Sequence, residues 1–213
     1  MTDSSKQARI WDISQPLGPG LPVWPGDTPF EQARTWQMEE GSPVNVSALT
    51  LSTHSGAHAD APLHYSQTAS DIASVPLEPY LGECLVVDAS GVGPIIEVGD
   101  LPHLHSACRI LFRTFEKFPL QQWDNDTTAI APETIEWLAV QGVKLVGIDG
   151  PSIDPQSSKT MDAHKAVLKH DVRVLEGLVL DDVPEGRYEL IALPLPIEGG
   201  DASPVRAILR ELQ

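Results

Sequence analysis

The chain has 213 residues, of which 41% are hydrophobic and 21% charged, so it is long enough to bury a core without cross-links. Its formal net charge of −16 excludes nucleic acid and anionic membranes as expected partners, because both bind clustered lysine and arginine. We expect one domain that spans residues 1–213.

Short strands and a few helices are predicted along the chain, separated by turns rich in proline and glycine. Helices are predicted at residues 132–141 and 162–170, with Pro132 in the first turn of the former and Gly142 at its C-terminal cap. Alternating or continuous apolar residues predict strands at 8–14, 45–53, 82–89, 108–114, 143–149 and 187–195. Several of these strands do not alternate with helices, which indicates an α/β fold of irregular order.

The sequence predicts a soluble protein of the cytoplasm. It has no run of about 20 apolar residues to span a bilayer, and its polar N-terminus has no apolar signal-peptide core. Cys84 and Cys108 each lie in an apolar segment, which favours two buried thiols over a disulfide or a metal pair.

Three of the seven histidines and one aspartate lie close together directly after the predicted strand 45–53: His54, His58, Asp60 and His64. Imidazole and carboxylate groups are ligands that suit zinc, manganese, iron or cobalt. The small residues between them favour a tight strand-to-helix turn whose backbone folds close around an ion. We therefore interpret the cluster as a metal site rather than as unrelated surface histidines.

A hydrolytic metal site keeps one position open for water and needs a base nearby. His54, His58 and Asp60 form a plausible three-ligand set, which leaves His64 to carry protons near neutral pH. In the alternative arrangement, His64 is a ligand and another residue is the base. Sequence motifs of serine hydrolases, P-loop proteins and dinucleotide-binding proteins are absent. The residues therefore predict a metal-dependent hydrolase.

The segment STHSGAHADAPLHY at residues 52–65 resembles the signature of the cyclase-like metal hydrolases. The resemblance extends over nearly the whole chain, and longer segments resemble the kynurenine formamidase branch of that family. These segments are WDISQPLGPGLPVWPGDTPF, GIDGPSIDPQSSKTMDAH and DASPVRAIL. Ala57 stands where the wider family frequently has threonine, which removes a hydroxyl group but no ligand.

The resemblance implies a swivelling β/β/α domain with a mixed sheet. It also implies a site for two divalent metal ions per subunit, with zinc as the expected metal. In this arrangement His54, His58 and Asp60 hold the first ion, and Asp60 also bridges to the second. His164 binds the second ion, and Glu176 bridges both.

Two further residue roles follow from the resemblance. His64 is the catalytic acid and base, and Trp24 lies against the aromatic ring of the substrate. Without the resemblance, the residues alone leave open whether His164 or His170 completes the second metal site.

The implied reaction is the hydrolysis of N-formyl-L-kynurenine to L-kynurenine and formate, in tryptophan degradation by the kynurenine pathway. The partner is then a small aryl formamide, and the family leads us to expect a homodimer. One alternative is a related amide hydrolase that acts on isatin or a cyclic imide. A second alternative, from another class, is a metal-binding protein that keeps the fold without catalysis.

Overall fold

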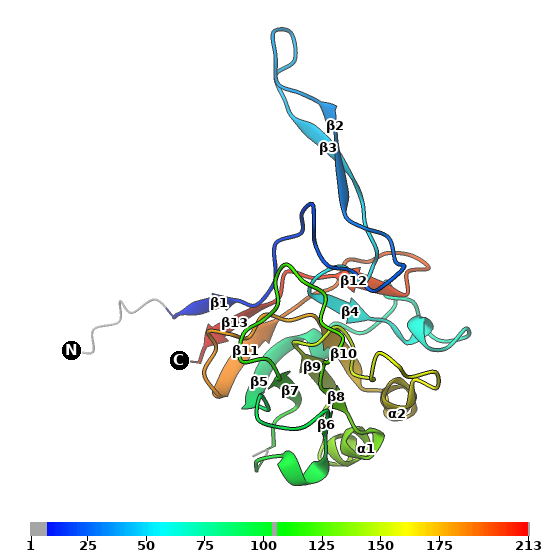
Figure 1. The fold of residues 1–213 in the computed structure, drawn as a ribbon, viewed down its shortest axis with the longest axis vertical. Helices are drawn as coiled ribbons and strands as arrows, with labels where there is room; N and C mark the ends of the chain where they lie inside the picture. The colour runs from blue at the N-terminus through cyan, green and yellow to red at the C-terminus, as the bar shows by residue number, and fades with distance from the viewer. Residues whose placement is uncertain (1–7, 104–105, 213) are drawn as a thin grey trace, which may run out of the picture.

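The structure is a computed structural model that describes residues 8–103 and 106–212. Figure 1 shows a curved sheet, α-helices that cover part of it, and a hairpin that extends away from the body. None of the helices in the described ranges combines the length and the apolar character that crossing a bilayer requires.

A mixed sheet forms the body of the molecule. Within the described residues it has nine strands, in the order β1-β13-β11-β5-β7-β9-β10-β4-β12. The strands β5, β7, β9 and β10 run parallel to their neighbours in this group, whereas the outer pairs are antiparallel. The predicted α/β class with a mixed sheet is therefore confirmed. The bounds of the strands, in sheet order, are β1 (Ile10–Asp12), β13 (Ile208–Glu211), β11 (Gly186–Ile191), β5 (Leu81–Asp88), β7 (Arg109–Arg113), β9 (Leu145–Ile148), β10 (Arg173–Glu176), β4 (His58–Asp60) and β12 (Ala202–Pro204).

The remaining elements surround this sheet. Two small sheets pair β2 with β3 and β6 with β8, and the helices α1 and α2 pack against each other. The bounds are β2 (Glu31–Trp36), β3 (Val46–Thr50), β6 (Ile95–Ile96), β8 (Ala129–Ile130), α1 (Pro132–Val140), α2 (Asp162–His170) and the 3₁₀ turns η1 (Pro62–His64), η2 (Glu78–Tyr80) and η3 (Val98–Asp100).

Both faces of the central strands are buried, because each faces an apolar layer. Successive side chains of a strand point to opposite faces, so Ile110 and Phe112 of β7 pack in the cluster that contains Ile135 of α1 and Val167 of α2. Leu111 lies in the other cluster, with side chains of β5, β11 and β13. Three consecutive apolar residues at 110–112 are expected in a strand that is buried on both faces.

The predicted helices are confirmed, and α1 ends one residue before the predicted boundary. The predicted strand-to-helix turn around residues 54–64 is wrong in detail. After a turn at 53–57 the chain forms β4, which is paired on both sides, and only then the 3₁₀ turn η1. Long-range pairing to β10 and β12 satisfies the backbone here, which local sequence does not reveal. Cys108 is exposed rather than buried, whereas Cys84 is buried as expected.

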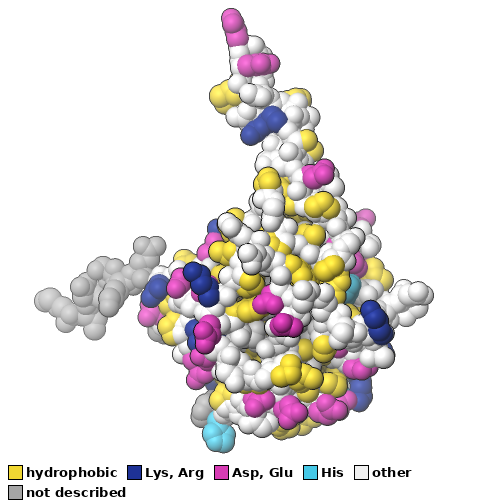
Figure 2. All heavy atoms as spheres, in the orientation of Figure 1, with side chains coloured by type: hydrophobic (Ala, Val, Ile, Leu, Met, Phe, Trp, Pro, Cys, Tyr) yellow, Lys and Arg dark blue, Asp and Glu magenta, His cyan; other side chains and the backbone are white. Residues whose placement is uncertain are grey.

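The β2–β3 hairpin is an exposed arm. All six residues of β2 and four of the five residues of β3 are exposed. Large apolar side chains lie along it, among them Trp36, Met38 and Leu49, which are 57%, 60% and 54% exposed. Figure 2 shows hydrophobic and charged side chains together on this arm. The arm therefore adds apolar surface and no core to the monomer.

A glycine allows the backbones of the β10 end and the 54–57 turn to meet. Gly177 has a φ of 64°, and a Cβ atom there would lie 2.5 Å from the carbonyl oxygen of Gly56. Such a distance is shorter than any normal van der Waals contact, and the left-handed conformation disfavours other residues. The contact holds the residue after Glu176 against the segment between His54 and His58.

We expect Gly177→Ala to destabilise the protein more than the matched control Gly142→Ala. Gly142 also has a positive φ, of 92°, but has open space around its Cβ position. The backbone conformation alone costs about 1–3 kcal/mol, and only Gly177→Ala adds an overlap with another backbone. Thermal unfolding should therefore show the lower Tm for Gly177→Ala. Equal Tm values for the two variants would show that the close approach is relaxed at no cost.

Candidate metal centre

Side chains from four separate segments converge at one end of the sheet. His58 and Asp60 belong to β4, and His54 to the turn before it, whereas His164 lies in the first turn of α2 and Glu176 ends β10. The antiparallel register of β10 and β4 sets Glu176 directly opposite His58. This strand pair thus joins two residues that lie far apart in the sequence.

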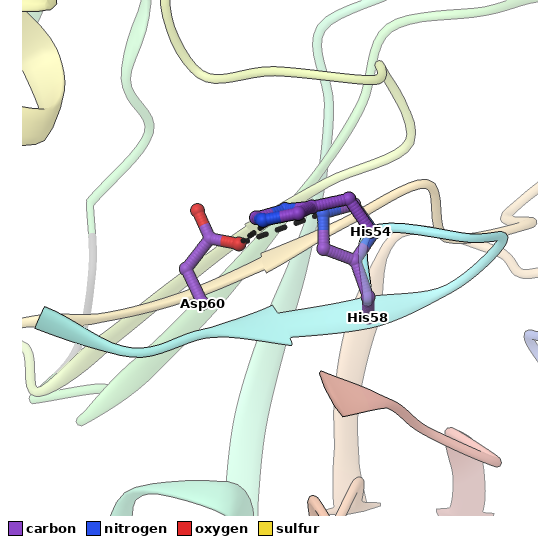
Figure 3. A group of neighbouring side chains, drawn as sticks. All are labelled: His54, His58 and Asp60. Carbon is purple, nitrogen blue, oxygen red and sulfur yellow. Dashed lines mark ion pairs between the residues drawn. The ribbon is translucent and has the colours of Figure 1, made fainter. Parts of the chain in front are cut away.

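The two carboxylates lie within reach of three imidazole nitrogens. Oδ1 of Asp60 is 3.2 Å from Nδ1 of His54 and 3.5 Å from Nε2 of His58. Dashed lines in Figure 3 mark the ion pairs among these three residues. Oδ2 of Asp60 is 3.3 Å from Nε2 of His164. The oxygens of Glu176 lie 3.3 Å from Nε2 of His58 and 3.5 Å from Nε2 of His164. Asp60 and Glu176 therefore face the same small group of nitrogens.

The outer nitrogen of each ring faces an acceptor of its own. Nδ1 of His58 donates to the carbonyl oxygen of Gly56 at 2.9 Å. Nδ1 of His164 is 2.6 Å from Oδ2 of Asp154, and Nε2 of His54 is 3.1 Å from Oδ2 of Asp201. In a neutral ring, an acceptor at the outer nitrogen sets the tautomer in which the inner nitrogen carries a lone pair. These nitrogens then have the form that binds a metal ion.

Asp154 also determines where α2 begins. Its carboxylate accepts the backbone N–H groups of Ala163 and His164 at 3.1 and 3.0 Å, which are free donors in the first turn of a helix. Met161, the residue before the helix, has a left-handed backbone and provides no side-chain cap. A carboxylate from a preceding loop therefore replaces the usual cap and orients His164 as well.

The described residues fit a divalent metal ion. His58, Asp60, His164 and Glu176 are buried, and burying carboxylates is costly unless positive charge or hydrogen bonds compensate. Nε2 of His58 and Oδ1 of Asp60 are both buried and have no hydrogen-bond partner among the described residues. These two atoms are 3.5 Å apart. A cation bound by both would satisfy them, and the nitrogen and oxygen donors suit zinc and similar metals.

The close packing of histidines and carboxylates shifts the pKa values of the cluster. Burial lowers the pKa of His54, but the nearby negative charge of Asp60 and the hydrogen bond with Asp201 outweigh it and raise the pKa to about 9. For His164 burial acts in the same direction, and Asp154 and Asp60 again outweigh it, so that its pKa is raised. Burial raises the pKa of Asp60, but the hydrogen bond with His164 and the nearby ring of His54 lower it below its usual range. Without a metal, protonated histidines therefore balance the carboxylates.

His64 lies beside this group and is partly exposed. It ends η1, and its ring centroid is 4.2 Å from that of His54 and 5.8 Å from that of His164. Burial lowers its pKa, the charge of Asp60 opposes this, and the nearby His54 lowers it further, with a net decrease. His64 also offers a ligand atom within 4.8 Å of those of Asp60 and His164. His64 is thus close enough to the other site residues to be either a proton carrier or a metal ligand.

A pocket of about 530 Å³ opens onto the histidines. Trp24 lines it and packs edge-on against Trp123, with ring centroids 5.5 Å apart. Phe115 and Phe118 line the same pocket. Its volume and aromatic lining are typical of a site for a small organic molecule.

The structure brings together most of the predicted site residues. His54, His58, Asp60, His64, His164 and Glu176 meet around one point, and Trp24 lies in the adjoining pocket. His170, the other candidate for the second metal site, lies at the far end of α2 beside Glu136.

Sequence reasoning missed several residues around the site: Asp154, Asp201, Trp123, Phe115 and Phe118. Asp154 and Asp201 stand in the segments that resemble the formamidase branch, but the resemblance assigns a role to neither. Their partners are 10 and 147 positions away. No local spacing signals such contacts.

Comparisons with known proteins agree with this geometry. Residues 11–155 match the Cyclase family model, described as "Putative cyclase". The kynurenine formamidase of Erythrobacter litoralis (strain HTCC2594) is 66% identical over 212 residues, which cover 100% of this chain and 98% of that protein.

Solved structures share the fold. A potential metal-dependent hydrolase with cyclase activity has a TM-score of 0.85 and 28% identity, over 97% of this chain and 100% of that one. An isatin hydrolase bound to the product analogue thioisatinate has a TM-score of 0.82 and 21% identity, over 97% of this chain and 93% of that one. The family match covers well over half of the chain, and the identity to the curated relative is high over its whole length. The chain therefore belongs to the cyclase family, in the branch of the kynurenine formamidases.

Proposed function

We propose that this chain is an arylformamidase that hydrolyses N-formyl-L-kynurenine to L-kynurenine and formate, in tryptophan degradation by the kynurenine pathway. The observation that carries the metal-dependent hydrolysis is the arrangement of three histidines whose inner nitrogens face two buried carboxylates. The choice of substrate is supported by the relative at 66% identity, which is named a kynurenine formamidase.

We assign two divalent metal ions, with zinc as the expected metal, to the cluster. In this proposal His54, His58 and Asp60 would hold the first ion and His164 would hold the second, and the carboxylates of Asp60 and Glu176 would be shared between the two. The unpartnered buried atoms of His58 and Asp60 support it, as does the name of the metal-dependent hydrolase that shares the fold. When bound, such an ion lowers the pKa of water from 15.7 to about 7 and polarises a carbonyl group.

His64 moves the protons of the reaction. With its pKa held below the usual value, its ring is neutral at pH 7 and accepts a proton from the attacking water. The amide nitrogen of an aryl formamide leaves poorly as an anion, so it needs a proton as the C–N bond breaks. His64 returns the proton to that nitrogen, which gives the amine and formate.

The pocket selects the aryl part of the substrate. Trp24 offers a ring face or edge to the aromatic ring of the substrate, and the edge-on contact with Trp123 holds it in place. The formyl group is small enough to reach the histidines at the base of the pocket. Isatin or a cyclic imide is the alternative substrate, but the likeness to isatin hydrolase, at 21% identity, is one of fold.

We further propose that residues 1–213 act as one hydrolase domain in a cytoplasmic homodimer. The exposed arm with Trp36, Met38 and Leu49 supports a second copy as its partner, because apolar surface of this kind marks interaction sites. Free cysteines at 84 and 108 support a reducing compartment.

Metal removal and reconstitution test the proposed activity. Chelator-treated protein should lose the hydrolysis of N-formylkynurenine, followed by kynurenine absorbance, and zinc, manganese or cobalt should restore it. Isatin assayed in parallel should be turned over far more slowly. If none of the three metals restores formamide hydrolysis, the proposed function is wrong. If isatin is the better substrate, the alternative holds.

One variant tests whether His64 is the proton carrier or a metal ligand. His64→Ala should lower kcat by about 10²–10⁴-fold, because the proton carrier is lost, while metal content stays near that of the wild type. His170→Ala, at the far end of α2, is the matched control and should change neither quantity. Loss of metal together with activity in His64→Ala would identify His64 as a ligand.

Zinc affinity should rise with pH. In the metal-free protein the raised pKa values of His54, about 9, and of His164 keep both rings protonated at pH 7. A metal ion must displace these protons, so each one weakens binding about tenfold per pH unit below its pKa. Competition with a chromophoric chelator at pH 7 and 8 measures this. An affinity that does not change between these values would contradict the raised pKa values.

A further inference from the structure

The carboxylate of Asp201 lies between two histidines with different proposed roles. Its Oδ2 is 3.1 Å from Nε2 of His54 and 3.6 Å from Nδ1 of His64. The two imidazole rings lie side by side, with centroids 4.2 Å apart and planes tilted by 48°. A single oxygen atom therefore faces a metal ligand and the proton carrier at once.

Asp201 is fixed by both its side chain and its backbone. Its Oδ1 accepts the hydroxyl of Thr53 at 2.9 Å, and its carbonyl oxygen accepts the N–H of Ala61 at 2.9 Å. The next residue begins β12, where Ala202 pairs with Asp60. The strand pair that carries Asp60 thus also sets the position of Asp201.

We propose that Asp201 is a positioning residue that orients His64 and His54 together. It accepts Nδ1–H of His64, which leaves Nε2 as the nitrogen that takes and returns the proton. It also accepts Nε2–H of His54, which turns Nδ1 of that ring toward Asp60. The inference rests on the proposed role of His64 in formamide hydrolysis.

The geometry suits both contacts. A carboxylate oxygen has two lone-pair directions and accepts two donors. A carboxylate beside the outer nitrogen of an imidazole fixes its tautomer and orientation. The 3.6 Å separation to His64 exceeds a hydrogen bond, and contacts of catalytic groups tighten when substrate binds. Asp154 holds the outer nitrogen of His164 in the same manner. Asp201 would hold the outer nitrogens of His54 and His64 as Asp154 holds that of His164.

A double-mutant cycle tests the link to His64. At saturating zinc, Asp201→Ala should lower kcat for N-formylkynurenine about 10–100-fold and change KM by less than about twofold. In the His64→Ala background the same substitution should lower kcat little further, because residues that act through one another are not additive. An equal loss in both backgrounds would overturn this part of the proposal.

Zinc affinity, measured without substrate, tests the link to His54. Asp201→Ala should weaken zinc binding about 10–100-fold, with or without His64. Asp201→Asn keeps one acceptor oxygen and should lose less in both assays, and it serves as a second variant if Asp201→Ala folds poorly. Unchanged zinc affinity in Asp201→Ala would show that Asp201 does not orient His54.

Asp71→Ala is the matched control for movement of the loop. Oδ2 of Asp71 accepts the N–H of Gly199 at 2.7 Å, two residues before Asp201, and Asp71 makes no hydrogen bond or ion pair with either histidine among the described contacts. This variant should keep wild-type kcat and zinc affinity. If it reproduces the losses of Asp201→Ala, displacement of the loop explains them and the proposal is wrong. Failure of the proposed function is distinct, because wild-type protein would then hydrolyse no aryl formamide while the zinc measurements still test Asp201.

Discussion

Two buried carboxylates that face the same histidine nitrogens are the constraint on which the rest of this structure depends. Asp60 and Glu176 lie on neighbouring strands and are held close by the β4–β10 register. Their charges repel, and burial adds to the cost, so the fold must supply positive charge at that place. Protonated His54 and His164 supply it in the metal-free protein. A divalent cation can supply the same positive charge, since the inner nitrogens and the carboxylate oxygens already converge on one place.

The surrounding architecture serves to keep these groups in place. The strand β4 is only three residues long, but β10 and β12 pair with it on both sides, so its two ligands are held by backbone hydrogen bonds. The absence of a side chain at Gly177 lets the backbone at Gly56 approach closely. The outer nitrogens of the rings then meet acceptors from distant loops, such as Asp154. Precise orientation at the centre thus comes from contacts that surround it.

Local sequence was enough to find half of the candidate site. The close spacing of His54, His58, Asp60 and His64 gives the metal hypothesis directly. Both α-helices are also predicted, the first of them from the end signals Pro132 and Gly142. Glu176 and His164 entered only through family resemblance, because strand pairing and helix docking bring them in from far along the chain. The same reason hid Asp201, and the short strands β4, β10 and β12 have too few residues to show alternation.

The carboxylate of Asp154 couples the start of α2 to the candidate metal centre. The start of α2 and the orientation of His164 depend on the same two oxygen atoms. Fraying of the first helical turn, which in most helices is a local and inexpensive fluctuation, here also releases the imidazole. A bound ion would therefore suppress that fluctuation, and the end of the helix would open only together with the centre of the sheet. The ligand and the helix form one cooperative unit.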